Sequence, residues 1–335
     1  MLTIDGKESG GQALRSGLSL SAVTQTPFKM INIRGAREKG GLAHQHLTAV
    51  KAMQDLTNAK VEGMQLSSNE LTFIPSKIKG GKFRIDIGTA GSTTLLLQTL
   101  IPACLHEEIP SELEVTGGTD TQWALPSLYF KNIFCYFLKK IGVDLDVEIR
   151  KHGFYPKGQG NIVLKIKPCK KIKEFEFVER GALKDIEVLV YGSESLRNKN
   201  VAEKMLSSFK DNFKEGFKSE IRYVPTASES CFIHATASYE KTRLGHTALL
   251  MDNEQPETSG ERCAKTLKEE MESNAVVDRF AADQLMLYMA LAGNSKILTS
   301  KIRNHVTTNS LVIEKFLPVK FTIENNVISC QRIDA

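Results

Sequence analysis

The stretch PFKMINIRGAREKGGLAHQHLTAVKAMQDLTNAKV, residues 27–61, decides the fold class. An apolar run at 27–33 predicts a strand, which a glycine-containing turn at 34–41 ends. Apolar residues then recur with helical spacing over 43–57, as expected of an amphipathic helix. Its apolar face consists of Leu47, Val50, Met53 and Leu56. The stretch therefore predicts a strand, a loop, a helix and a second strand that begins near residue 59.

The same order of elements appears in two later parts of the chain. The predicted strands and the helices that follow them cover 111–116, 123–141, 296–299 and 310–316. The first and second units are each preceded by a strand, a glycine loop and a helix, beginning at Ile4 and Ile85. Recurrence of one supersecondary unit is the signature of an architecture built from internal repeats.

Spacing between the units predicts an insertion. Met30 and Leu113 are 83 residues apart, whereas Leu113 and Ile297 are 184 apart, so about a hundred residues are added in the third unit. The segment 181–270 supplies most of them and has its own strand and helix patterns. We therefore expect an α+β fold in which 1–180 and 271–335 form a large three-unit domain and 181–270 form a smaller inserted α/β domain.

Composition is that of an ordinary globular protein. The 335 residues are 41% apolar and 25% charged, with a net charge of +5. These values exclude a disordered tail and a polycation that coats nucleic acid. The absence of a long apolar run, of a signal-peptide pattern and of closely spaced cysteines predicts a soluble cytoplasmic protein without membrane contact, zinc site or disulfides. Most of this net charge falls within residues 1–60, where eight Lys and Arg face four acidic residues.

The first glycine loop, 5–12, precedes a helix that contains Arg15. Glycines let a backbone approach phosphates closely, and a helix N-terminus offers unpaired N–H groups to an anion. The Glu8 carboxylate in this loop suits Mg²⁺ better than it suits phosphate. A tight turn with a solvated Glu8 is the other interpretation, and the loop alone leaves both open.

Arg34 and Arg37 stand three residues apart before a helix start that contains Gln45 and His46. Two forked guanidinium groups beside a helix N-terminus indicate a clamp for a polyphosphate or for RNA phosphates. A basic surface turn is equally compatible with these residues.

His305 precedes hydroxyl and amide side chains at 307–309 that suit the start of a helix. A neutral imidazole there could attack phosphorus while the helix N-terminus stabilises the anion. A surface or capping histidine is the alternative. Gln98 and the pair Asp283-Gln284 lie within apolar helices, where a buried polar group is either functional or held by a structural hydrogen bond.

Taken in order, these segments resemble the RNA 3′-terminal phosphate cyclases over nearly the whole chain. The motifs that carry the resemblance are Ile4-Asp5-Gly6, Gly10-Gly11-Gln12, Ile87-Gly88-Thr89-Ala90-Gly91-Ser92, Gly117-Gly118-Thr119-Asp120, His152-Gly153-Phe154-Tyr155-Pro156, Ala282-Asp283-Gln284-Leu285, the stretch from His305 to Asn309, and Phe316-Leu317-Pro318-Val319. The resemblance implies three βαβαββ-type repeats with an inserted α/β domain, in agreement with the spacing. The first glycine loop is shorter than is usual in the family, and Thr121-Gln122-Trp123 replaces a proline-containing stretch.

The resemblance also implies an ATP-dependent reaction through a histidyl-AMP intermediate. AMP passes from the histidine to an RNA 3′-phosphate, and the neighbouring 2′-OH displaces it to leave a 2′,3′-cyclic phosphate. By match of motif, His305 is the nucleophile and Glu8 a ligand of Mg²⁺ or Mn²⁺. The positions expected to bind ATP or phosphate are Arg15, Arg34, Arg37, Gln45, His46, Gln98, Pro126, Tyr129, Asp283 and Gln284.

The expected partners are ATP and RNA that ends in a 3′-phosphate, bound by a monomer or a homodimer. One alternative is a cyclase-like protein of ribosome assembly, which lacks the nucleophilic histidine. His305 in its Thr-Asn context argues against it. Another alternative is an enolpyruvyl transferase with related repeats, but motifs of that group are not found in this sequence.

Overall fold

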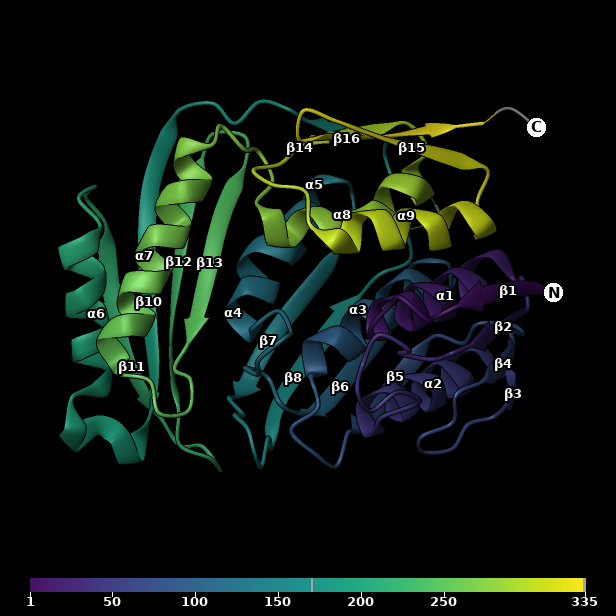
Figure 1. The fold of residues 1–335 in the computed structure, drawn as a ribbon, viewed down its shortest axis with the longest axis horizontal. Helices are drawn as coiled ribbons and strands as arrows, with labels where there is room; N and C mark the ends of the chain where they lie inside the picture. The colour runs from purple at the N-terminus through teal and green to yellow at the C-terminus, as the bar shows by residue number, and fades with distance from the viewer. Residues whose placement is uncertain (170, 334–335) are drawn as a thin grey trace.

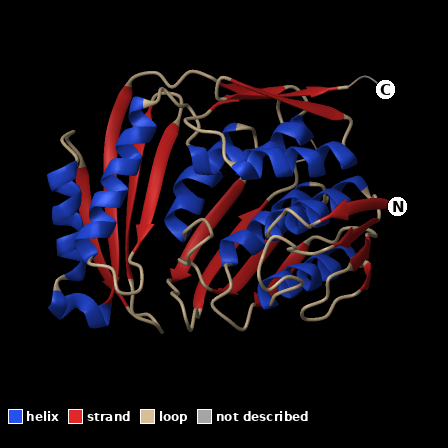
Figure 2. Ribbon diagram, viewed as in Figure 1, coloured by secondary structure: helices blue, strands red, loops and turns tan. Residues whose placement is uncertain are grey.

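The structure is a computed structural model that describes residues 1–169 and 171–333. Residues 170, 334 and 335 lie outside the described residues, so the end of the predicted range 271–335 is not covered. The described residues form four sheets of four strands each, with helices packed between and against them (Figure 2). This mixed composition of helices and sheets is consistent with the α+β class expected from the sequence.

Two of the sheets are formed before residue 170. The first sheet and its helices are β1 (Leu2–Asp5), α1 (Gly11–Thr24), β2 (Phe28–Ile31), α2 (His44–Thr57), β3 (Lys60–Glu62) and β4 (Leu71–Ile74). The second consists of β5 (Gly81–Asp86), α3 (Thr93–Leu105), β6 (Ser111–Gly117), α4 (Ser127–Tyr129), the π-helical turn η1 (Phe130–Phe134), α5 (Cys135–Lys140), β7 (Leu145–Lys151) and β8 (Gly160–Ile166).

The other two sheets follow. One contains β10 (Leu183–Ser193), the 3₁₀ helix η2 (Glu194–Lys199), α6 (Val201–Asn212), β11 (Lys218–Val224), β12 (Cys231–Tyr239), β13 (Arg243–Leu249) and α7 (Pro256–Glu272). The other is built from β9 (Phe175–Phe177), α8 (Arg279–Ala292), β14 (Ser295–Leu298), α9 (Asn304–Phe316), β15 (Val319–Glu324) and β16 (Val327–Arg332). The strand β9 therefore pairs with a strand, β14, that lies more than a hundred residues later in the chain.

One pairing order is shared by the sheets of β1–β4, of β5–β8 and of β9 with β14–β16. In each, the first two strands pair in parallel, as in β1 with β2, β5 with β6 and β9 with β14. The second strand pairs antiparallel with the fourth, and the fourth with the third. The sheet of β10–β13 has a different order, β11-β10-β12-β13.

Two separate cores hold the molecule together. The larger one combines buried side chains from all three sheets that share the pairing order, with α1 packed against α2, α3 and α9. Figure 1 shows α8 and α9 between the sheet of β14–β16 and the layer that contains α1 and α3. Residues 186–275 bury a second core between β10–β13 and the helices α6 and α7. Leu128, Phe154, Tyr191 and Phe232 form a small cluster that joins the two parts.

All six cysteines, each of them a described residue, are free. Within the described ranges, no helix combines the length and the apolar character that a membrane crossing requires.

Two helices begin at positions other than those the sequence pattern predicted. Helix α9 begins at Asn304 rather than at 310, so His305 lies inside its first turn. Arg303 precedes the helix with an extended backbone, and Thr308 is accommodated within the helix, where its Oγ1 donates to the carbonyl oxygen of Asn304 at 3.3 Å. The helix predicted over 123–141 begins only at Ser127, because Pro126 precedes it with an extended backbone.

Candidate active site

Three helix N-termini without a side-chain cap meet at one cavity. Helices α1, α2 and α9 begin after Gly10, Ala43 and Arg303, and none of these residues accepts a capping hydrogen bond through its side chain. Their first turns carry no acidic residue. First-turn residues of all three helices line a cavity of about 600 Å³. Unpaired N–H groups and helix dipoles therefore favour an anion in this cavity.

Four arginines line the same space, which we call the arginine cavity; they are Arg15, Arg34, Arg37 and Arg303. Burial lowers the pKa of Arg15 to about 10, while the carboxylate of Asp283 raises it, so the guanidinium stays charged at neutral pH. Arg15 Nη2 donates to Gln12 Oε1 at 2.7 Å, and Arg34 Nη1 donates to the carbonyl oxygen of Gly41 at 3.0 Å. Asp283 is the one carboxylate among the described lining residues, so the cavity is strongly positive.

Asp283 ties α8 to the rest of the site. Burial raises the pKa of its carboxyl to about 6, whereas Arg303, the amide of Gln284 and Arg15 lower it. Its backbone carbonyl accepts from Asn309 Nδ2 of α9 at 3.2 Å. Gln284 Oε1 in turn accepts from Gln98 Nε2 of α3 at 2.9 Å. Three helices are thus fixed relative to one another at the floor of the cavity.

His305 lies at the rim of the arginine cavity, exposed on the first turn of α9. Burial lowers the pKa of its imidazole, and the guanidinium groups of Arg303, Arg15 and Arg37 lower it further. The imidazole is therefore neutral at physiological pH and keeps a lone pair for nucleophilic attack.

His46 lies deeper in the cavity and is only 4% exposed. Burial lowers the pKa of His46 to about 3, with Arg15 and Arg34 acting in the same direction. Within the described part of the chain its Nδ1 atom is buried without a hydrogen-bond partner. A buried polar atom without a partner is uncommon in folded proteins, and here it belongs to a residue that lines a charged cavity.

Gly11 allows α1 to approach His46. A Cβ atom on Gly11 would lie 2.2 Å from His46 Nε2 and 3.0 Å from Arg15 Nη1. Both distances are shorter than van der Waals contact, so only glycine permits this arrangement at the start of α1.

We expect Gly11→Ala to raise the KM for a polyphosphate ligand by about ten- to a hundred-fold, because misplacement of binding groups by about 1 Å costs this much. The added methyl group displaces His46 and Arg15 from their present positions. Gly216→Ala is the matched control, since a Cβ there meets nothing within 4 Å. Equal KM values for the two variants would contradict this account of Gly11.

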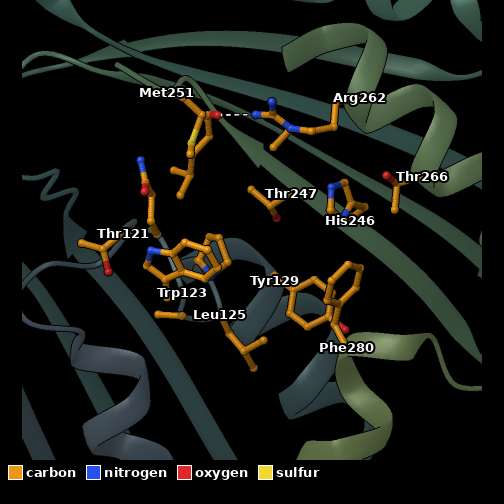
Figure 3. Close-up of a pocket in the computed structure, with 15 residues that line it drawn as sticks. Thr121, Trp123, Leu125, Tyr129, His246, Thr247, Met251, Arg262, Thr266 and Phe280 are labelled. Atoms are coloured by element: carbon orange, nitrogen blue, oxygen red, sulfur yellow. Dashed lines mark hydrogen bonds between the residues drawn. The ribbon is translucent and has the colours of Figure 1, made fainter. Parts of the chain in front are cut away.

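A second cavity of about 510 Å³ opens beside the first, with mostly apolar walls; we call it the apolar cavity (Figure 3). Phe280 lines both cavities, and Pro126 lines the apolar one. Tyr129 also borders it, but its side chain is 2% exposed and its hydroxyl donates to the Asp278 carboxylate. Its ring packs edge-on against Phe280, with centroids 6.4 Å apart. The buried ring of Tyr129 therefore supports Phe280 and has little exposed surface on which a ligand could stack.

The structure brings most of the predicted site residues together. Those that line the arginine cavity are Arg15, Arg34, Arg37, Gln45, His46, Asp283, Gln284 and His305. Gln98 lies beneath it, bonded to Gln284, and Pro126 and Tyr129 border the apolar cavity. Glu8 is exposed and is not among the lining residues, although Gly10 and Gly11 of the same loop are. The described residues hold no cluster of three or more His, Cys, Asp or Glu that could bind a metal ion.

Arg303 and Phe280 line the arginine cavity and were not predicted. Each had a signal in the sequence. Phe280 lies three residues before Asp283 and four before Gln284, a spacing that places all three on one face of a helix. Arg303 precedes His305 by two residues and becomes part of the site because α9 begins earlier than predicted.

The sequence is similar to that of a known protein family over nearly its whole length. A family model described as RNA 3′-terminal phosphate cyclase matches residues 6–323. The RNA 3′-terminal phosphate cyclase of Pyrococcus furiosus is 37% identical over 332 residues, which cover 98% of this chain and 96% of that protein. The proteins of the same name from Staphylothermus marinus and Archaeoglobus fulgidus are 39% and 37% identical over 334 and 337 residues, which cover 95% and 98% of this chain and 92% and 99% of theirs.

Among solved structures, EPSP synthase from Acinetobacter baumannii aligns with a TM-score of 0.32 and 13% identity, covering 98% of this chain and 64% of that one. A likeness of this size carries no argument about fold or function. The family model and the related sequences, by contrast, extend over nearly the whole length. This chain belongs to the RNA 3′-terminal phosphate cyclase family, a family of enzymes.

Proposed function

We propose that the protein is an ATP-dependent RNA 3′-terminal phosphate cyclase that works through a histidyl-AMP intermediate. The observation that carries the proposal is the position of His305 on an uncapped helix N-terminus, among arginines that lower its pKa. A neutral nucleophile beside groups that bind anions is the arrangement that attack on a phosphate ester requires.

The two adjoining cavities suit the two ends of ATP. The triphosphate would lie in the arginine cavity, where Arg15, Arg34 and Arg37 supply charged donors. The adenine would lie in the apolar cavity against Phe280 and Pro126, which offer a flat apolar wall next to it. Because Phe280 lines both cavities, one nucleotide can reach from one into the other.

The proposed chemistry has three balanced steps. An imidazole nitrogen of His305 forms a bond to the α-phosphorus of ATP, and the bond from that phosphorus to the bridging oxygen breaks to release pyrophosphate. An oxygen of the RNA 3′-phosphate then attacks the same phosphorus and breaks the P–N bond. Finally the RNA 2′-OH attacks the 3′-phosphorus, loses its proton and expels AMP. Arginines and helix N-termini stabilise the negative charge that develops in each step, and the last step gains from proximity.

Glu8 remains the proposed ligand for Mg²⁺ or Mn²⁺. A single exposed carboxylate does not form a dedicated metal cage, but Mg²⁺ is usually held by one or two carboxylates together with substrate phosphates and water. Glu8 lies two residues before Gly10, which lines the arginine cavity, so its loop is suitably placed for a cation that arrives with the triphosphate. A divalent cation there would neutralise phosphate charge.

We further propose that the three sheets with one pairing order are copies of one unit, formed by 1–180 and 271–335. In this proposal 181–270 is an inserted α/β domain, supported by its separate core and its different strand order. A cytoplasmic location and a monomeric or homodimeric state stay predictions from the sequence.

The proposal is tested by incubating the protein with ATP, Mg²⁺ and an RNA oligonucleotide that ends in a 3′-phosphate. We expect a product with a 2′,3′-cyclic phosphate end, which resists phosphatase, together with stoichiometric AMP and pyrophosphate. Binding of the RNA without formation of the cyclic phosphate, AMP or pyrophosphate would favour the non-catalytic ribosome-assembly alternative.

The pH dependence of adenylylation tests the state of His305. Because the pKa of this imidazole is lowered, the group loses its lone pair only at a pH below its ordinary value of about 6.5. We expect the acid limb of kcat/KM for adenylylation to have its midpoint below 6.5. The carboxyl of Asp283 has a pKa of about 6, so its titration could overlap with that of His305. Asp283→Asn removes this carboxyl and leaves the titration of His305. A midpoint above 6.5 in that variant would contradict the assignment.

A further inference from the structure

Trp123 is the sole tryptophan of the chain, and it is 87% exposed. It lies where three cavities meet, since it lines the arginine cavity, the apolar cavity and a third of about 330 Å³. We call this third one the side cavity. Its walls include Tyr155 and Leu250, from the loop after β7 and the loop after β13. Gln45 and Gln122 line both the side cavity and the arginine cavity, so the two adjoin.

The backbone holds the Trp123 side chain in this exposed position. Trp123 has a φ of 65°, a left-handed conformation that is unfavourable for a bulky residue and persists where surrounding structure fixes it. Both ends of its loop are fixed. The buried Asp120 carboxylate accepts from Ser127 N at 2.9 Å, and Thr94 Oγ1 donates to the carbonyl oxygen of Leu125 at 2.6 Å. The loop therefore presents an indole face to the cavities instead of burying it.

Charge distinguishes the side cavity from the arginine cavity. Glu229 and Asp252 are exposed carboxylates on its wall, and the described residues that line it include no lysine or arginine. A phosphate is repelled from such a wall and attracted to the four arginines next to it. The wall suits a neutral group that carries N–H and O–H donors, because carboxylate oxygens accept hydrogen bonds from such donors. The edge of a nucleobase and the hydroxyls of a ribose are such groups.

We propose that the side cavity binds the terminal nucleobase of the RNA substrate, which stacks on Trp123 with Tyr155 as a second aromatic wall. This inference rests on the proposed function for the identity of the ligand. With the base there, the 3′-phosphate would lie past Gln45 in the adjoining arginine cavity, which His305 also lines. Aromatic stacking of single-stranded bases is tolerant of sequence, so the subsite grips an RNA end without selecting its base.

Tryptophan fluorescence reports on this subsite directly, because only Trp123 contributes to it. The protein is first saturated with an ATP analogue that cannot release pyrophosphate, and is then titrated with an RNA oligonucleotide ending in a 3′-phosphate. We expect a further, saturable quenching by the RNA. Quenching by the analogue with no additional change on RNA binding would show that the indole serves the nucleotide, and would overturn the proposal.

Variant kinetics give the second test. Trp123→Ala should raise the KM for RNA on the order of ten-fold, and by more than it raises the KM for ATP, while Trp123→Phe should retain most of the wild-type value. For an RNA with an abasic 3′-terminal nucleotide, the KM of the wild type should rise by the same factor. The KM of Trp123→Ala should not rise further with this RNA. Ile109→Ala is the control, an exposed apolar side chain outside the three cavities.

An equal KM for RNA in Trp123→Ala and the wild type would overturn the proposed subsite. So would a KM of Trp123→Ala that rises with the abasic RNA by as much as that of the wild type. Failure of the proposed function is recognised separately. A wild-type protein that forms no cyclic phosphate, but whose fluorescence RNA quenches, would retain the base subsite and lose the cyclase activity.

Discussion

His305→Ala lowers the rate of RNA cyclisation on the order of 10³-fold or more, the loss expected when a covalent nucleophile is removed. The imidazole is exposed at the cavity rim, so its removal leaves the packing of α9 intact. The arginines remain, and the variant should therefore still bind ATP. Cyclisation rates and ATP affinity, measured on the same preparation, separate the lost step from lost binding.

His44→Ala is the matched control for this variant. His44 is likewise exposed in the first turn of an uncapped helix, α2, but it does not line the arginine cavity. We expect wild-type rates for His44→Ala. A comparable loss in both variants would mean that a histidine at a helix N-terminus matters only for folding or for general charge.

Arg15→Met lowers kcat/KM for adenylylation by about 10²- to 10³-fold, the usual loss when a buried donor to a developing anion is removed. Burial of the Arg15 guanidinium lowers its pKa to about 10. The carboxylate of Asp283 attracts the guanidinium and raises this pKa. Methionine keeps most of the apolar stem, so packing between α1 and its neighbours is preserved.

Thermal stability shows whether Arg15 is present for function or for folding. Burying a charge outside an ion pair carries a desolvation cost, which an apolar side chain in its place removes. We expect the Tm of Arg15→Met to equal or exceed that of the wild type while activity falls. Arg15→Lys keeps a charge without the forked geometry, so its activity should lie between those of the wild type and Arg15→Met. A large drop in Tm with proportionate loss of activity would assign Arg15 a structural role.

Much of the site could be predicted because local sequence fixes it. Arg15, Gln45 and His46 follow glycine-rich turns and occupy the first or second turn of a helix, so their approach to one anion site follows from the order of elements. Asp283 and Gln284 stood out as polar residues in an apolar helix, and the structure buries Asp283 against groups from other helices.

Other features depend on contacts that no local pattern contains. The outward position of Trp123 follows from tertiary hydrogen bonds at the ends of its loop, whereas the sequence pattern placed Trp123 at the start of a helix over 123–141. Pro126 and Tyr129 are near the site, but Phe280, which was not predicted, borders both cavities and packs edge-on against Tyr129. Helix α9 begins earlier than predicted, directly after Arg303, and Arg303 lines the arginine cavity.

The most direct test of the account is to identify the residue that carries AMP. The protein is incubated with ATP labelled at the α-phosphorus and Mg²⁺, without RNA, and the labelled peptide is located by mass spectrometry under conditions that preserve a P–N bond. We expect an acid-labile adduct on His305 that RNA with a 3′-phosphate discharges. An adduct on another residue, or none in a protein that still cyclises RNA, would contradict the mechanism.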